Sequence, residues 1–253
     1  MMLNDLLALT RLVITDLTRM REGRVCIAGY NRQWECIRPV LPPPGINESS
    51  LYSQEQAMIF PFAVVQLNFT HHIPHPPHTE DRLYNPDITQ FEYRVNDERK
   101  QNILDHSIFE SVAEIFNAPI LTGPGFYIMD GAGDRSLGTI EPNAIVGVVY
   151  GQGEENRWKY RLSFEDGSGA SYWLTVTDLT WRYYCDWRRD QNIPPHQIAS
   201  ELFATLQAGR TYLRIGLARG WQNYPERCYL QITGVYTFPD YLDGRIFTDF
   251  IND

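Results

Sequence analysis

Lysine is nearly absent from this sequence, and duplex nucleic acid is a poor partner for so acidic a chain. Lys100 and Lys159 are the only lysines among 22 basic residues, so the other twenty are arginines. The 31 acidic residues give a net charge of −9, and an acidic surface does not coat duplex nucleic acid by bulk attraction. A local basic groove stays open, because the planar arginine fork suits phosphates and stacks on bases. Ordinary surface ion pairs explain the same arginines equally well.

Paired cysteines and long apolar runs are missing as well. No two of the four cysteines have CxxC spacing, which argues against a zinc site. The first twenty residues carry no basic leader, and polar residues interrupt their apolar run, so we expect neither a signal peptide nor a membrane span. This pattern predicts a cytoplasmic protein with no membrane partner. The cysteines are Cys26, Cys36, Cys185 and Cys228.

Short runs rich in β-branched and aromatic residues recur along the chain, bounded by Gly, Pro, Asn or Asp, and such runs are typical of strands. Helical spacing of apolar residues predicts a helix over 104–117, with Asp105 as its N-cap, and a second over 196–208, closed by Gly209. A mostly β chain with two helices indicates barrels or sandwiches. The predicted strands are 11–18, 24–30, 34–40, 62–69, 145–150, 157–164, 171–178, 211–218 and 228–236.

One short sequence is written twice, as LVITDLTRM at 12–20 and as LTVTDLTWR at 174–182. Each copy is followed by further strand-like runs, which suggests that each half of the chain carries one small barrel with a shared opening of strand, turn and two strands. The repeated acids are Asp16 and Asp178. We expect them to end a strand and accept hydrogen bonds from the turn, or to pair with a nearby arginine such as Arg24 or Arg38. A repeated functional carboxylate is the alternative.

Several separated motifs occur in the order TDLTRM, RVCIAGY, CIRPV, PHPPHTED, SLGTI, TDLT and LRIGLAR, and together they resemble the dual OB-containing domain family of bacteria. The resemblance implies a mainly β fold with a few helices, built as two tandem OB-fold-like small barrels. We assign 1–100 to the first barrel, 101–117 to a connecting helix, and 118–253 to the second barrel with a helical insertion around 194–209.

The same resemblance bears on function. It implies a nucleic-acid or nucleotide-binding module in bacterial antiviral defence, with no catalytic residues and no cofactor, and it leaves room for a partner protein encoded in the same operon. The ligand that we expect is single-stranded nucleic acid or a nucleotide.

OB barrels bind single strands through aromatic side chains that stack on bases and positive side chains that follow the backbone. We therefore expect the arginine and aromatic residues that alternate near the TDLT repeats to bind the nucleic acid. The alternative is that the aromatic residues fill the barrel interiors while the arginines face solvent. The candidate nucleic-acid-binding residues are Arg19, Arg24, Tyr30, Arg32, Trp34 and Arg38 in the first half and Trp181, Arg182, Trp187, Arg188, Arg219 and Trp221 in the second.

Two other readings of function stay open. Proline-rich loops and the lack of a catalytic motif also fit an adaptor for a partner enzyme, which predicts an exposed apolar patch. Scattered acids could instead serve a metal-dependent nuclease or nucleotide hydrolase, although none has diagnostic spacing. The histidine-rich loop at 71–78 is either a rigid loop that gates a ligand or, with Glu80 and Asp81, a metal site. The other scattered acids are Asp130 and Asp134.

Overall fold

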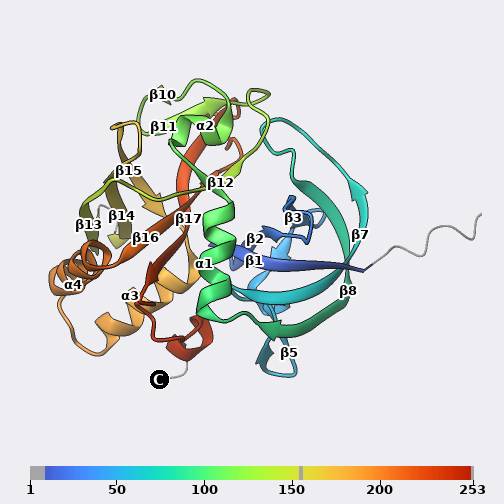
Figure 1. Ribbon diagram of the computed structural model, residues 1–253, viewed down its shortest axis with the longest axis horizontal. Helices are drawn as coiled ribbons and strands as arrows, with labels where there is room; N and C mark the ends of the chain where they lie inside the picture. Colours follow the sequence, from blue (N-terminus) through green and yellow to red (C-terminus); the bar gives the residue numbers. More distant parts are fainter. Residues whose placement is uncertain (1–8, 154–155, 252–253) are drawn as a thin grey trace, which may run out of the picture.

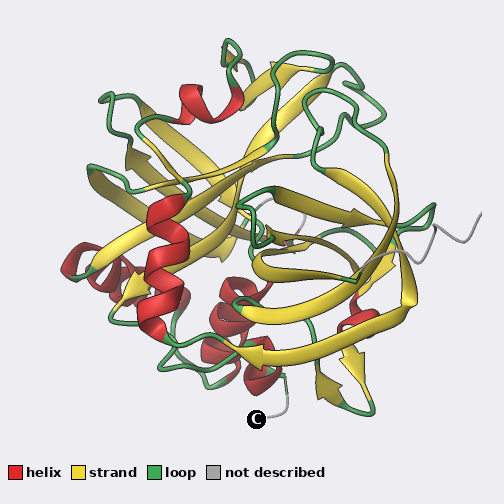
Figure 2. Ribbon diagram, turned by 45° about the vertical axis from the view of Figure 1, so that its right-hand side comes forward, coloured by secondary structure: helices red, strands yellow, loops and turns green. Residues whose placement is uncertain are grey.

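The computed structural model describes residues 9–153 and 156–251, which form two large sheets joined by a helix, α1 (Figures 1 and 2). Helix α1 (Asp97–His106) contributes Ile103 and Leu104 to an apolar cluster that also contains side chains from both sheets. The two sheets therefore pack against each other as well as against the helix. None of the helices in the described part of the chain is long and apolar enough to cross a membrane.

The first sheet is a closed barrel of five strands. Strand β1 pairs with β2 and β7, β2 pairs with β3, β3 runs parallel to β8, and β8 pairs with β7, which closes the ring. These strands are β1 (Thr10–Arg19), β2 (Arg24–Tyr30), β3 (Cys36–Val40), β7 (Ala63–His72) and β8 (Asp81–Arg94). Smaller elements follow β3: β4 (Ile46–Asn47), the 3₁₀ helix η1 (Glu48–Leu51), β5 (Tyr52–Ser53) and β6 (Gln56–Ala57).

The second sheet repeats this order of pairing. Strands β13, β14 and β15 pair in turn, β15 runs parallel to β17, and β17 pairs with β16. The counterpart of β1 is divided at residues 141–143 into β12, which pairs with β16, and β13, which pairs with β14. The strands are β9 (Ile108–Phe109), β10 (Leu121–Thr122), β11 (Phe126–Met129), β12 (Leu137–Ile140), β13 (Ala144–Gln152), β14 (Trp158–Glu165), β15 (Ser171–Val176), β16 (Arg210–Leu217) and β17 (Arg227–Phe238).

These sheets confirm the mainly β fold and the OB-fold-like architecture that the resemblance implies. Each predicted strand corresponds to an observed one, because alternate apolar residues fill each barrel interior. Strand β8 and helix α3 (Leu179–Asp190) were missed. The predicted helix at 196–208 is confirmed as α4 (Pro195–Ala208), which packs on β13 beside the break between β12 and β13.

The single helix predicted over 104–117 is wrong, because two shorter helices are present instead. Helix α1 begins after Asn96, whose side chain accepts a hydrogen bond from the backbone N–H of Arg99, so Asp105 is not the N-cap. It ends at His106, with Ser107 as the C-cap, and a separate helix, α2 (Val112–Phe116), starts after Ser111. The apolar pattern in the sequence runs across the break between the helices because the strand β9, which lies there, is also apolar. This strand pairs with β12.

The two TDLT copies do not occupy equivalent places in the two sheets. The first lies inside β1, whereas the second follows β15 and opens α3, where Asp178 caps the helix. The shared opening inferred from the repeat is therefore wrong, because β1 corresponds to β12 and β13. The copies instead lie side by side: Thr18 and Asp178 form an antiparallel bridge, and the N–H of Arg19 donates to the carbonyl of Thr177 at 2.8 Å.

Candidate nucleic-acid interface

The outer face of β1, β2 and β3 is covered by the second barrel. Side chains alternate along β2, so Val25 and Ile27 enter the barrel core while Cys26 and Tyr30 point outward. Tyr30 belongs to an apolar cluster with Tyr212 of β16 and Tyr236 of β17. This outer face, which we call the covered face, is therefore part of the contact between the two barrels.

A buried arginine holds the covered face in place. Arg214 of β16 is fully buried, and its Nε and Nη2 donate to the carboxylate of Asp16 at 2.8 to 3.2 Å. Its Nη1 donates to the hydroxyls of Tyr30 and Thr139, each at 2.9 Å. Burial alone would lower the pKa of Arg214, but the charge of Asp16 raises it well above its usual value. Asp16 is thus paired with an arginine, as one reading of the sequence predicts, but the partner is Arg214.

Three of the predicted binding residues are unavailable to a polymer because their side chains are buried. Tyr30 contacts Arg214, and Arg38 donates from Nε to the Oδ1 of Asp81 at 2.6 Å. Trp181 is 1% exposed and packs in the core of the second barrel. For these three residues, burial supports the alternative reading, that aromatic and basic residues serve the structure.

The remaining predicted residues are partly or fully exposed, but they do not form one surface. Most are engaged with neighbouring side chains. Arg19 lies over Tyr183 and Trp34 stacks on His106, while Arg24 pairs with Glu22. On α3, the guanidinium of Arg182 lies over Tyr160, Arg188 pairs with Glu201, and Trp187 packs against Phe250. Arg32 is exposed, and Arg219 and Trp221 lie on the loop between β16 and β17.

The face of the second barrel that corresponds to the covered face is exposed. Strands β13, β14 and β15 lie on the side of the molecule away from the first barrel (Figure 1). The alternation along β15 buries Tyr172 and Leu174 and turns Trp173 outward, where it is 53% exposed. The guanidinium carbon of Arg161 on β14 lies 5.3 Å from the centre of the Trp173 ring. Lys159 and Val149 also point outward from this surface.

A second aromatic group continues this surface across β17 and β11. Gln231 pairs with the outward Thr175, so Tyr229, two residues earlier on β17, points to the same side. The rings of Tyr127 and Tyr229 lie 5.5 Å apart, and the guanidinium carbon of Arg227 is 4.9 Å from the centre of the Tyr127 ring. We call this surface the open face, and its residues are Lys159, Arg161, Trp173, Tyr127, Tyr229, Arg227 and, on the adjoining loop, Trp221 and Tyr224.

The sequence contained a signal for the open face that the TDLT repeats obscured. The run SYWLTV was predicted as a strand, and strict alternation places Trp173 on the side opposite Tyr172 and Leu174. The two TDLT repeats lie at the contact between the barrels, so arginine and aromatic residues close to them in sequence include side chains that are buried there.

The histidine-rich loop joins β7 to β8 and packs against the second barrel. His78 is buried, with its Nε2 3.9 Å from the Sγ of Cys228, and the carboxylate of Glu80 accepts hydrogen bonds from the N–H and the hydroxyl of Ser136. Burial lowers the pKa of His78 to about 2, assisted by Arg38 and Arg219. Within residues 9–153 and 156–251, no group of three or more His, Cys, Asp or Glu side chains could hold a metal ion.

Comparison with known proteins identifies the family of the chain. The model of the dual OB-containing domain matches residues 11–235, so the chain belongs to that family, as its motifs predict. No curated protein and no solved structure matches the chain.

Proposed function

We propose that this dual OB-containing domain protein binds single-stranded nucleic acid on the open face of its second barrel, and that it acts by binding rather than by catalysis. In OB-folds, the surface of the second and third strands and the neighbouring loops is the usual place for oligonucleotides. Strands β14 and β15 hold those positions in the second barrel, and the loop between β16 and β17 adjoins them.

The observation that carries the proposal is the pair formed by the exposed Trp173 and the half-buried Arg161. A nucleobase can stack on an exposed indole irrespective of sequence. A guanidinium beside the ring can pair with the phosphate that follows the stacked base. The group around Tyr127 and Arg227 offers the same combination further along the surface, so a single strand has two successive places to stack.

The net charge of −9 shapes the expected ligand preference. Duplex gains little from stacking platforms because its bases are already paired, and the acidic body repels its dense phosphate charge. A single strand gains stacking energy that offsets this repulsion. We therefore expect single strands to bind more tightly than duplex of the same length, with an affinity that falls as salt rises.

The test is a titration of the protein against fluorescent single-stranded DNA, single-stranded RNA and duplex at two salt concentrations, with two tryptophan variants. Trp173→Ala removes one stacking platform and should weaken single-strand binding by about 1–3 kcal/mol, roughly 5- to 150-fold. Trp34→Ala is the matched control, because Trp34 is 43% exposed but lies in the first barrel against His106. If Trp34→Ala weakens binding and Trp173→Ala does not, the open face is not the site.

One observation favours protein binding as a second candidate function. Strand β8 exposes three large apolar side chains, Ile88, Phe91 and Tyr93, on the first barrel. An adaptor role would use one or more of these exposed side chains and would show binding that barely depends on salt. Phe91→Ser would then abolish capture of the partner while leaving any single-strand binding intact.

A further inference from the structure

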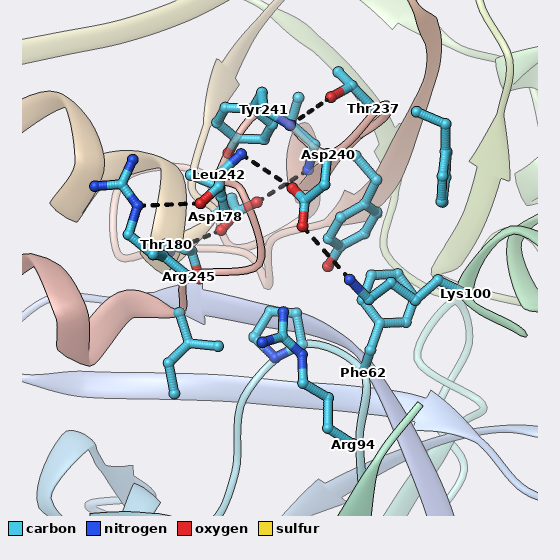
Figure 3. Close-up of a pocket in the computed structure, with 15 residues that line it drawn as sticks. Phe62, Arg94, Lys100, Asp178, Thr180, Thr237, Asp240, Tyr241, Leu242 and Arg245 are labelled. Atoms are coloured by element: carbon cyan, nitrogen blue, oxygen red, sulfur yellow. Dashed lines mark hydrogen bonds and ion pairs between the residues drawn. The ribbon is translucent and has the colours of Figure 1, made fainter. Parts of the chain in front are cut away.

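The contact between the two barrels leaves no room for a partner molecule. The cavity at this contact offers only about 30 Å³ to molecules the size of water, which is room for about two of them. Figure 3 shows its acids engaged by the protein itself, with Asp178 held by backbone N–H groups and Asp240 beside the Nζ of Lys100. A further interaction surface therefore has to lie on the outside of the molecule.

Strand β13 lies at the outer edge of the second sheet, on the side away from the first barrel (Figure 1). It pairs with β14 along one edge, and no strand in the described part of the chain pairs with its other edge. The start of this free edge is protected, because a bulge lies between Ile145 and Gly147 and the side chain of Gln207 on α4 donates to the carbonyl oxygen of Ile145. The stretch from Val148 to Gln152 has no such protection.

The backbone of this stretch presents hydrogen-bonding groups to the free edge. The N–H of Gly153 donates to the carbonyl of Arg157 on the side of β14. In an antiparallel pair, successive residues turn their N–H and C=O groups alternately toward the partner strand and away from it. Counting back from Gly153, the groups of Val148, Tyr150 and Gln152 point away from β14, and no described residue forms a hydrogen bond with them there. Because buried backbone groups are nearly always paired, these groups are accessible to solvent.

The free edge of β13 carries no charge. Exposed edges usually have charged residues or proline, which discourage pairing with another chain. Beyond its contact with β3, strand β8 also has an edge without a partner strand among the described residues, and it contains Pro86, Asp87, Glu92 and Arg94. The nine residues of β13 include neither a charged residue nor proline. On a chain with a net charge of −9, two copies can meet at this edge without opposing like charges.

Val149 and Gly151 have matching shapes on the outer side of β13. Val149 is 41% exposed. Gly151 does not have a positive φ that would require glycine, and a Cβ added to it would meet no atom within 4 Å. Glycine weakens the interior of a strand and often marks a place where another backbone approaches closely. The space beside Gly151 can thus accept a valine side chain from another strand.

We propose that β13 pairs with β13 of a second copy of this chain, antiparallel about a two-fold axis, with the two Tyr150 residues opposite each other. In this register Val148 of each copy lies opposite Gln152 of the other, and their free N–H and C=O groups form hydrogen bonds. Val149 lies opposite Gly151, so the exposed valine fills the open space on both sides of the axis. An unrelated strand does not supply this double match, whereas a second copy always does.

The pairing would join the second sheets of the two copies into one continuous sheet, with both open faces on the same side. The dimer does not depend on the function proposed above. If both are correct, a single strand would pass from one open face to the next and gain affinity because its second contact is intramolecular.

The experiment is sedimentation velocity of the whole protein over a series of concentrations, without nucleic acid. We expect the mass to rise from that of one chain, 29.4 kDa, toward that of two chains. Val149→Lys places a charge on the edge and should weaken association at least about tenfold. Ile88→Lys is the matched control, because Ile88 is 44% exposed on β8, and it should associate as the unmodified protein does.

Cross-linking tests the register of the two strands. Opposite residues that are not hydrogen-bonded in an antiparallel pair have Cα atoms about 4.5 Å apart, which suits a disulfide. A mixture of the Val149→Cys and Gly151→Cys proteins should therefore form a cross-linked dimer under mild oxidation, and faster than either variant alone or the unmodified protein.

Three results would overturn the proposal. The first is a single chain at every concentration, and the second is a dimer that Val149→Lys leaves intact. The third is cross-linking of the mixture no faster than that of the single variants. Because no nucleic acid is present in these experiments, none of these results bears on single-strand binding to the open face.

Discussion

The outer surface of β1, β2 and β3 and the outer surface of β13, β14 and β15 hold the same place in the two barrels, but only the second is exposed. The covered face presents Asp16 and Tyr30 to a buried arginine on the other barrel. The open face presents Trp173 and Arg161 to solvent. Equivalent surfaces of the two barrels thus have different roles. One forms the contact between the barrels, and the other is exposed to solvent.

The difference shows why strand order alone does not locate a binding site. The charged groups of the covered face have a structural role, because they form ion pairs within the chain. Asp16 pairs with Arg214, and Arg38 pairs with Asp81. On the open face, the guanidinium of Arg161 lies over Trp173, while Arg227 contacts Tyr127 and Tyr224 and pairs with the neighbouring Glu226. In a tandem OB-fold, the surface that can bind a ligand is the one that stays exposed after the two barrels pack against each other.

The largest effect that we expect comes from removing the buried ion pair between Arg214 and Asp16 on the covered face. Arg214→Met removes the partner of Asp16 and leaves a buried carboxylate without its cation, which should lower the free energy of unfolding by about 3–5 kcal/mol. Urea denaturation followed by fluorescence measures the change. Arg161→Ala is the matched control on the open face, and it should change stability by less than about 0.5 kcal/mol. Equal effects of the two variants would show that the faces do not differ as described.

A second comparison sets two tryptophans of the same barrel against each other. Trp181 lies in the core and Trp173 lies on the open face. Trp181→Ala should lower the free energy of unfolding by about 3–5 kcal/mol because it leaves a large cavity, whereas Trp173→Ala should leave stability nearly unchanged. Thermal unfolding of both variants provides the measurement. A stable Trp181→Ala protein would contradict the burial of that side chain.

The TDLT repeat marks the limit of what the sequence could predict. Strand positions followed from local alternation, and the family followed from motifs along the chain. The two copies nevertheless adopt different structures, because Asp16 meets Arg214, which is 198 residues away, while Asp178 meets the first N–H groups of α3. A short polar motif is compatible with both surroundings. Only tertiary contacts decide between them.

The candidate site shows the same limit. Alternation along 171–176 could have placed Trp173 outward, because that depends on a single strand. The burial of Tyr30 and Arg38 could not be foreseen, since it depends on which surface of one barrel meets the other. The helix predicted over 104–117 failed for a similar reason, because pairing of β9 with β12 interrupts an apolar pattern that is continuous in sequence.

A smaller effect concerns the histidine-rich loop, which joins β7 to β8 and packs against the second barrel. The folded protein keeps His78 neutral down to about pH 2, whereas the unfolded chain takes up a proton near pH 6.5. Unfolding therefore binds a proton below pH 6.5, and stability falls as the pH drops. The contribution of His78 approaches about 1.4 kcal/mol per pH unit.

The measurement for His78 is the free energy of unfolding at several pH values between 6.5 and about 5. His78→Leu should flatten the dependence relative to the unmodified protein. Groups such as Asp178, whose raised pKa acts in the opposite direction, are present in both proteins and cancel in the difference. His75→Leu is the control, since His75 is exposed beside Asp130. Parallel curves for the unmodified protein and His78→Leu would mean that this imidazole is accessible to protons in the folded state.

The smallest expected effect concerns the salt dependence of single-strand binding to the open face. Each phosphate neutralised on a single strand contributes about 0.7 to the slope of log K against log salt. Arg161→Ala should therefore reduce that slope by about 0.7 and weaken binding uniformly across sequences, because the guanidinium contacts phosphate rather than bases. Arg38→Lys, a change on the covered face, should leave the slope unaltered. A slope that depends on Arg38 and not on Arg161 would place the nucleic acid on the first barrel, and it would require the two barrels to separate before binding, since Arg38 is buried at their contact.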